Sequence, residues 1–188
     1  MKIFTPFALR TGIFLLLLCL SPYADAQHYV VSSQKSRVEF RIYGHKNGNE
    51  LIKGLFTEIS GNIVFNPKEP GKSSFDVTVN AGSINTGSHE RDHDLESAHF
   101  MLASKFPEIK IKSTSVTADG NVVYILHGNL TIKGVTKPVD IQFTATPTAG
   151  GYLFRGSFQV NRLLYNVGEK GDIDNMVTLF VELKADKK

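Results

Sequence analysis

The sequence has no apolar run long enough to cross a bilayer as a helix. The longest run, at 13–20, is far shorter than the roughly 20 residues that a spanning helix needs. Lys2 and Arg10 precede it, and the small-residue pattern Ala24-Asp25-Ala26 follows it. This order is typical of a secretory signal peptide, so we expect cleavage after Ala26 and an exported chain that begins at Gln27. An uncleaved anchor is the alternative.

Cysteine is almost absent too, because Cys19 is the only one. It lies inside the expected leader, and the bulky Leu18 before it disfavours the alternative, lipid modification at Cys19. A mature chain without a thiol can form no disulfide, thiolate metal site or cysteine nucleophile. Export would place it in an oxidising compartment, such as the periplasm or the medium.

Charge of one sign is lacking as well. The net charge is only +3, and the Lys and Arg residues are scattered among the acids. Nucleic-acid binding needs a basic stripe with interleaved aromatic residues, so it is not predicted.

Catalytic signatures are missing: the sequence has no nucleophile elbow, phosphate-binding glycine loop or dinucleotide fingerprint. We therefore predict neither an enzyme nor a cofactor. His89, His93 and His99 lie close together among acidic residues, but no fixed spacing supplies the rigid further ligand that a zinc site requires. A solvated, charge-rich helix is the preferred interpretation, and no metal is predicted.

What the sequence does contain is alternation of apolar and polar residues, which predicts half-buried strands. It is clearest at 38–42, 75–79, 139–145 and 177–183, and further strands are expected at 109–116 and at 124–132, the latter bent at Gly128. Turn residues separate these segments, namely Asn47-Gly48-Asn49, Asn66-Pro67, Pro70-Gly71, Asp119-Gly120-Asn121 and Gly150-Gly151. Seven to nine strands joined by hairpins predict an antiparallel barrel or sandwich.

Two segments depart from the alternation. Between Ser88 and Met101 we expect a short helix with Ser88 as its N-cap, laid over one rim. Arg91 and Asp92 there could pair with each other, cap the helix or meet a ligand headgroup. Residues 184–188 are expected to be a solvated tail.

The interior of such a barrel can be filled by side chains or can hold a ligand, and strand number does not choose between them. Small residues suggest space inside, in Ser113-Thr114-Ser115 and in Thr144-Ala145-Thr146. From periodicity alone, both alternatives stay open.

A set of motifs resembles the YceI-like family. The motifs are Ser83-Ile84-Asn85-Thr86, then Arg91-Asp92 with Leu95, Ser97 and Phe100, then Phe106-Pro107-Glu108-Ile109, and the run Gly128-Asn129-Leu130-Thr131-Ile132-Lys133-Gly134-Val135-Thr136-Lys137-Pro138-Val139. They occur in the family's order, and the resemblance covers the chain from about Tyr29 to Leu183. It implies an all-β, eight-stranded antiparallel lipocalin-like barrel with a short rim helix, formed by residues 27–188, which encloses a long isoprenoid or related acyl chain.

The ligand implied by the resemblance is a long-chain apolar lipid of the polyisoprenoid, quinone-like or fatty-acyl class. No stable membrane span is predicted, and the oligomeric state is open, with a homodimer among the options. The residues expected to line the tunnel are Phe40, Ile42, Phe75, Val77, Val79, Ile111, Ile141, Phe143, Phe158, Val160, Val177, Leu179 and Val181. Their alternative role is packing outside the barrel or under the rim helix.

Three functions follow as hypotheses. A lipid carrier or store leads, an envelope stress or interaction module with a filled barrel comes second, and an unrecognised enzyme comes third. A lipid that co-purifies with the mature protein would separate the first from the others.

Overall fold

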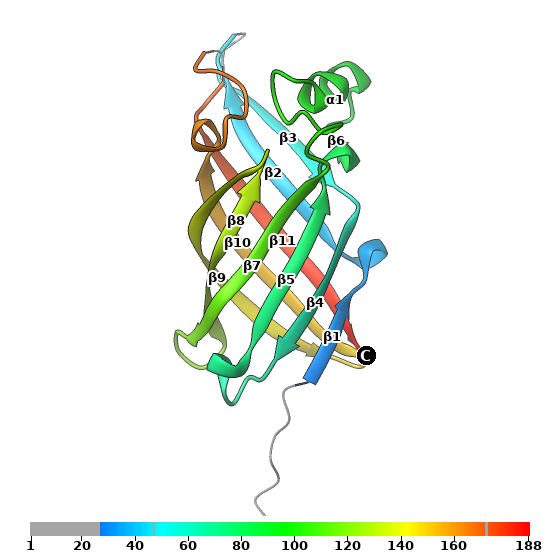
Figure 1. Ribbon diagram of the computed structural model, residues 1–188, viewed down its shortest axis with the longest axis vertical. Coiled ribbons are helices and arrows are strands. Elements are labelled where there is room, and N and C mark those ends of the chain that lie inside the picture. Colours follow the sequence, from blue (N-terminus) through cyan, green and yellow to red (C-terminus); the bar gives the residue numbers. More distant parts are fainter. Residues whose placement is uncertain (1–26, 47, 172) are drawn as a thin grey trace, which may run out of the picture.

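The computed structural model describes residues 27–46, 48–171 and 173–188, so the expected leader lies outside the described residues. These residues form one α-helix and a set of strands, and most strands that are consecutive in the sequence lie side by side in the sheet (Figure 1). The strands are β1 (Gln27–Val31), β2 (Arg37–Gly44), β3 (Glu50–Phe56), β4 (Ile59–Phe65), β5 (Ser74–Asn80), β6 (Ile84–Asn85), β7 (Glu108–Ala118), β8 (Val123–Ile132), β9 (Val135–Thr148), β10 (Gly151–Asn161) and β11 (Met176–Lys187); the helix is α1 (His89–Glu96).

These strands close into an eight-stranded antiparallel barrel, which confirms the predicted fold class. β1 and β2 act as one long stave interrupted by the 3-10 turn Ser33–Lys35, because β11 pairs with both of them. β3 and β4 form the neighbouring stave in the same way, since β3 pairs with β2 and β4 pairs with β1. From β4 the order continues through β5, β7, β8, β9 and β10 to β11. The β1–β11 pairing closes the ring, which leaves few unpaired edges.

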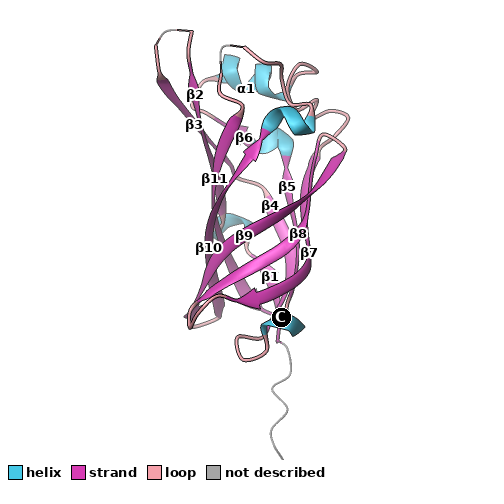
Figure 2. Ribbon diagram, turned by 90° about the vertical axis from the view of Figure 1, so that its left-hand side faces the viewer, coloured by secondary structure: helices cyan, strands magenta, loops and turns pink. Residues whose placement is uncertain are grey.

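The two ends of the barrel differ. α1, the β2–β3 hairpin and the β10–β11 connection lie at one end, which we call the rim, and the C-terminus lies at the other, which we call the base (Figure 1). The short strand β6 pairs with the end of β3 and leads into α1 (Figure 2). No helix among the described residues is long and apolar enough to span a membrane.

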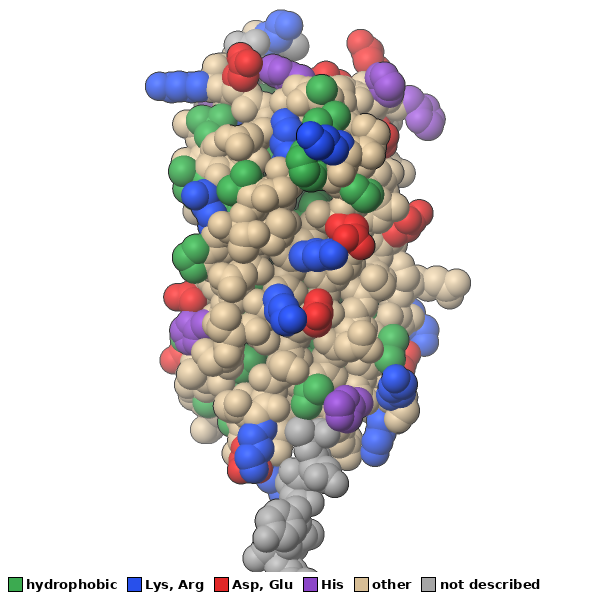
Figure 3. Space-filling view, in the orientation of Figure 1, with side chains coloured by type: hydrophobic (Ala, Val, Ile, Leu, Met, Phe, Trp, Pro, Cys, Tyr) green, Lys and Arg blue, Asp and Glu red, His purple; other side chains and the backbone are tan. Residues whose placement is uncertain are grey.

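The predicted alternation holds in the structure. On β2, Val38, Phe40 and Ile42 are buried, while the residues between them face outward. Figure 3 shows the consequence on the face in view, where basic and acidic side chains are interspersed. The expected turns at 66–67, 70–71, 119–121 and 150–151 also join consecutive strands at the predicted places, and Asn47 of the remaining turn lies outside the described residues.

The strand predicted at 124–132 is continuous as β8, and Gly128 lies opposite a register shift in β7 between Ser113 and Ser115. A Cβ at Gly128 would lie 2.8 Å from the carbonyl oxygen of Lys112. The position therefore requires glycine because the bulged neighbour approaches too closely for a side chain.

The helix begins as predicted, since the Ser88 Oγ accepts a hydrogen bond from the Arg91 backbone N–H at 3.4 Å. It ends at Glu96, and residues 97–107 continue as turns. Asp92 anchors the helix to the residue that follows β6: one carboxylate oxygen accepts from the Thr86 N–H at 2.7 Å and from the Thr86 hydroxyl at 2.6 Å.

The expected solvated tail at 184–188 is wrong. β11 extends to Lys187, Ala185 is fully buried, and the Lys188 N–H donates to the carbonyl of His28. The sequence did not indicate this closing strand, because the segment is mostly charged and its buried residue, Ala185, is small.

Candidate functional site

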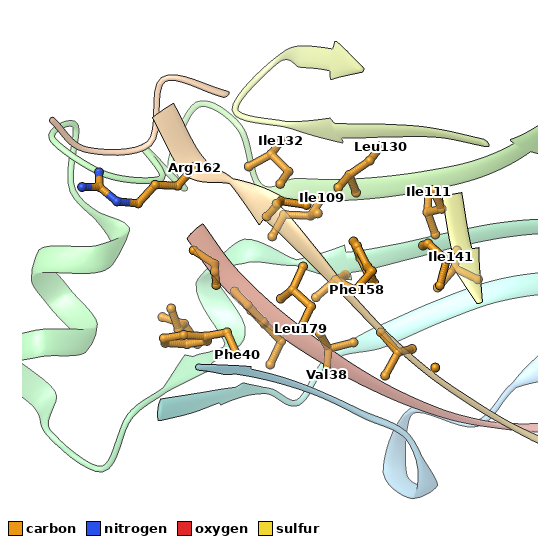
Figure 4. Close-up of a pocket in the computed structure, with 18 of the residues that line it drawn as sticks. Val38, Phe40, Ile109, Ile111, Leu130, Ile132, Ile141, Phe158, Arg162 and Leu179 are labelled. Atoms are coloured by element: carbon orange, nitrogen blue, oxygen red, sulfur yellow. The ribbon is translucent and has the colours of Figure 1, made fainter. Parts of the chain in front are cut away.

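The rim half of the barrel is hollow. A cavity of about 210 Å³ lies inside it, and alternate residues of the surrounding strands form its wall. In Figure 4 the labelled apolar side chains come from several strands and surround this space, and Arg162 lies at the edge of the group. Because nearly every lining side chain is apolar, the space is suited to hydrocarbon and unsuited to water, which needs polar partners.

All thirteen residues expected to line a tunnel lie on this cavity wall, so for these strands the assumed inward face is the right one. Whether they contact a ligand stays a prediction. Several are only half-buried, among them Phe158 and its cross-strand partner Leu179. They are enclosed by the barrel, so their exposed surface faces the cavity itself.

The wall contains more residues than the sequence indicated. Strand residues such as Val38, Ile109, Leu130 and Ile132 continue the alternation and could have been found from it. Others come from α1 and from irregular segments at the rim, where no alternation marks an inward residue. These are Leu95 of α1, Phe100, Met101, Val167 and Ile173.

The small residues that suggested internal space lie elsewhere. None of Ser113-Thr114-Ser115 or Thr144-Ala145-Thr146 lines the cavity. Ser113 instead accepts a hydrogen bond from the Phe75 N–H at 2.8 Å, and Ala145 packs against the core. The hint was wrong because small side chains here accommodate a bulge and neighbouring strands.

The base half of the barrel is filled by aromatic rings. Phe65 is only 1% exposed, and its ring centroid lies between 5.0 and 6.4 Å from those of five neighbours. These neighbours are Phe75, Tyr124, Phe143, Tyr152 and Phe154. The barrel therefore combines a packed core at the base with an open cavity at the rim.

A buried arginine holds the rim connection in place. Arg162 is 4% exposed and donates to the carbonyls of Asp174, Val167, Glu169 and Ile173 at 2.7 to 3.2 Å. Burial lowers the pKa of the guanidinium from its ordinary value. The four carbonyl oxygens compensate for this loss of hydration, because arginine stays charged in proteins. The cation is thus used to fold the β10–β11 connection over the cavity.

A second contact joins the segments that cover the rim. The Lys133 Nζ, in the β8–β9 turn, donates to the carbonyls of Ala98 at 3.0 Å and Asn166 at 2.8 Å. The Gly168 N–H donates to the carbonyl of His99 at 3.0 Å. The segment after α1 and the β10–β11 connection are therefore held together above the cavity.

The three histidines near the helix lie apart from the cavity. His89, His93 and His99 are exposed, and none of them lines it. Within 27–46, 48–171 and 173–188, no cluster of three or more histidine, cysteine or acidic side chains could hold a metal ion.

With this geometry in view, the comparisons with known proteins identify the family. A model of the YceI-like domain matches residues 29–186. The chain belongs to the YceI-like family. Relatives from Salmonella arizonae and Salmonella paratyphi B, each called Protein YceI, are 38% identical over 128 residues, which is 67% of this chain and 65% of the relative. The match thus spans less than two thirds of the relatives' own length.

Solved structures show the same fold. BcnA of Burkholderia cenocepacia has a TM-score of 0.76 at 23% identity and covers 81% of this chain and 98% of its own. A polyisoprenoid-binding domain from Saccharophagus degradans, implicated in plant cell wall breakdown, has a TM-score of 0.69 at 13% identity and covers 85% and 98%. At these identities the likeness concerns the fold of the YceI-like barrel.

Proposed function

We propose that this YceI-like barrel is an exported, non-catalytic protein that holds the apolar chain of a long isoprenoid or related acyl lipid. The observation that carries the proposal is the apolar cavity in the rim half of the barrel. Burial of each methylene group contributes about 0.8 kcal/mol, so hydrocarbon can bind there without polar contacts. The family membership and a neighbour described as a polyisoprenoid-binding domain support the same ligand class.

The placement of polar groups supports binding without chemistry. Among the residues that the structure describes, Arg155 and Arg162 are the only charged ones on the cavity wall, and both are engaged: Arg155 pairs with Glu182, and Arg162 donates to four carbonyls. No acid, base or nucleophile faces the cavity among the described residues. A bound lipid would therefore be held without being changed.

The rim is the end at which the headgroup would stay. The base is closed by packed rings, whereas the rim is covered by the segment after α1 and the β10–β11 connection. A polar headgroup in the apolar interior would lose its hydrogen bonds with water. The chain would therefore enter with its apolar end first.

Export is part of the proposal and rests on the sequence. The positively charged start, the short apolar run and Ala24-Asp25-Ala26 form a cleavable leader, which would place the protein in the periplasm or outside the cell.

Leu179→Glu tests the cavity as the binding site. Leu179 faces the cavity, and a carboxylate there would cost several kcal/mol against a hydrocarbon chain. We expect the affinity for a fluorescent fatty acid to fall at least about a hundredfold, which corresponds to ~2.7 kcal/mol. The matched control is Thr178→Glu, because the adjacent Thr178 lies on the outer face, where it accepts a hydrogen bond from Gln159.

The parent protein is first purified without detergent, and its organic extract is analysed by mass spectrometry. Circular dichroism then establishes that both variants are folded. If Leu179→Glu binds like the parent, or if the parent yields no lipid and binds no apolar probe, the proposal is wrong and an interaction module becomes the better account.

A further inference from the structure

The cavity ends at a floor of aromatic rings. Phe75, Phe143 and Phe154 line the cavity and also belong to the aromatic cluster of the base. Their ring centroids lie 5.2 to 6.1 Å from one another. These three side chains therefore separate the hollow half of the barrel from the filled half.

The floor is supported from below. Phe65 lies behind all three rings, and Tyr124 and Tyr152 stack on Phe143 and Phe154 at centroid distances of 5.4 and 5.8 Å. Edge-to-face and stacked pairs of this kind contribute attraction beyond the area that they bury. A floor packed in this way resists displacement by an incoming chain, since interiors are as dense as organic crystals.

The size of the cavity limits what lies above this floor. An apolar cavity of about 150 Å³ accommodates a benzene molecule, and a volume of about 210 Å³ accommodates on the order of ten carbons. That is less than the roughly 300–1,000 Å³ of sites that enclose whole drug-sized ligands. A long lipid would thus be buried over one terminal part only.

We propose that Phe143 and Phe154 fix the length of chain that the barrel buries, so that the protein recognises the apolar terminus of a lipid and leaves the remainder outside the rim. This inference rests on the proposed function, because it requires a chain in the cavity. It predicts that affinity rises with chain length only until the terminus reaches the floor.

Displacement of cis-parinaric acid by geraniol and farnesol tests the inference. Full burial of the additional isoprene unit of farnesol would tighten binding about a thousandfold. For the parent we expect farnesol to bind no more than about tenfold more tightly than geraniol. In Phe154→Ala the floor is lowered by one ring, and we expect the ratio to exceed about a hundredfold.

Two further variants keep the test decisive. Phe154→Leu opens less space and preserves more of the packing, so it provides a folded variant if Phe154→Ala unfolds. Its ratio of farnesol to geraniol affinity should lie between those of the parent and the alanine variant. Tyr29→Leu is the matched control: Tyr29 and Phe154 are both 3% exposed, but Tyr29 packs on Tyr152 and does not reach the cavity. It should keep the parental ratio.

The outcomes separate this inference from the function on which it rests. If neither alcohol displaces the probe from the parent, both are wrong. If the alcohols bind and the parental ratio already approaches a thousandfold, the chain is not stopped by the floor and only the inference fails. It also fails if folded Phe154→Leu keeps the parental ratio, or if Tyr29→Leu changes the ratio as much as Phe154→Leu does.

Discussion

Replacing Arg162 by methionine should destabilise the barrel more than any exposed arginine could. The guanidinium donates four hydrogen bonds to backbone carbonyls from a site that is 4% exposed. A charged hydrogen bond contributes about 1.5–3 kcal/mol, but the four are not additive, since some carbonyls would regain water when the connection loosens. Loss of such a buried network typically costs about 3–5 kcal/mol.

A loss of this size is large against a total stability of about 5–15 kcal/mol. For a domain of this length each kcal/mol shifts Tm by roughly 2–4 °C, so Arg162→Met should lower Tm by about 10 °C. Thermal unfolding is followed by circular dichroism after lipid extraction, because bound ligand would raise the stability of each variant. Faster hydrogen exchange is expected in residues 163–171 and 173–175.

Arg155→Met is the matched control. Arg155 is exposed and pairs with Glu182, which also pairs with Arg37, so its loss should cost less than about 1 kcal/mol. If the Tm values of the two variants lie within about 2 °C of each other, the carbonyl network of Arg162 does not hold the rim and the reasoning is refuted.

Two further predictions concern the rim and the leader. Lys133→Met removes the ammonium group that donates to the carbonyls of Ala98 and Asn166. A bound fluorescent fatty acid should therefore dissociate up to about tenfold faster in stopped-flow measurements. An unchanged dissociation rate would contradict a role of Lys133 in covering the cavity. N-terminal sequencing of the exported protein should give Gln27 as the first residue, whereas retained Met1 or an acylated Cys19 would contradict a cleaved leader.

Alternation of apolar and polar residues made most of the barrel predictable from sequence. Strands such as β2 and β5 have a regular inward face, and this period of two survives in the structure. The rim was less predictable, since Phe100, Val167 and Ile173 line the cavity from irregular segments that carry no period. Arg162 gave no signal either, because its role depends on carbonyls of the following connection.

The choice between a filled and a hollow barrel was left open by periodicity because both kinds of interior have the same alternation. The structure shows that the level at which large inward rings meet decides it. On β5 the inward residues change from Phe75 at the base to Val77 and Val79 toward the rim, and on β9 they change from Phe143 to Ile141.

Rings from opposite staves can meet across the barrel, whereas valine side chains cannot. The barrel is therefore solid where rings of several strands contact one another, and hollow toward the rim, where Phe40 and Phe158 line the wall among aliphatic residues. The level at which the rings of several strands meet sets the depth of the cavity. Sequence analysis of a related barrel could locate that floor by ordering the inward residues of each strand by size from base to rim.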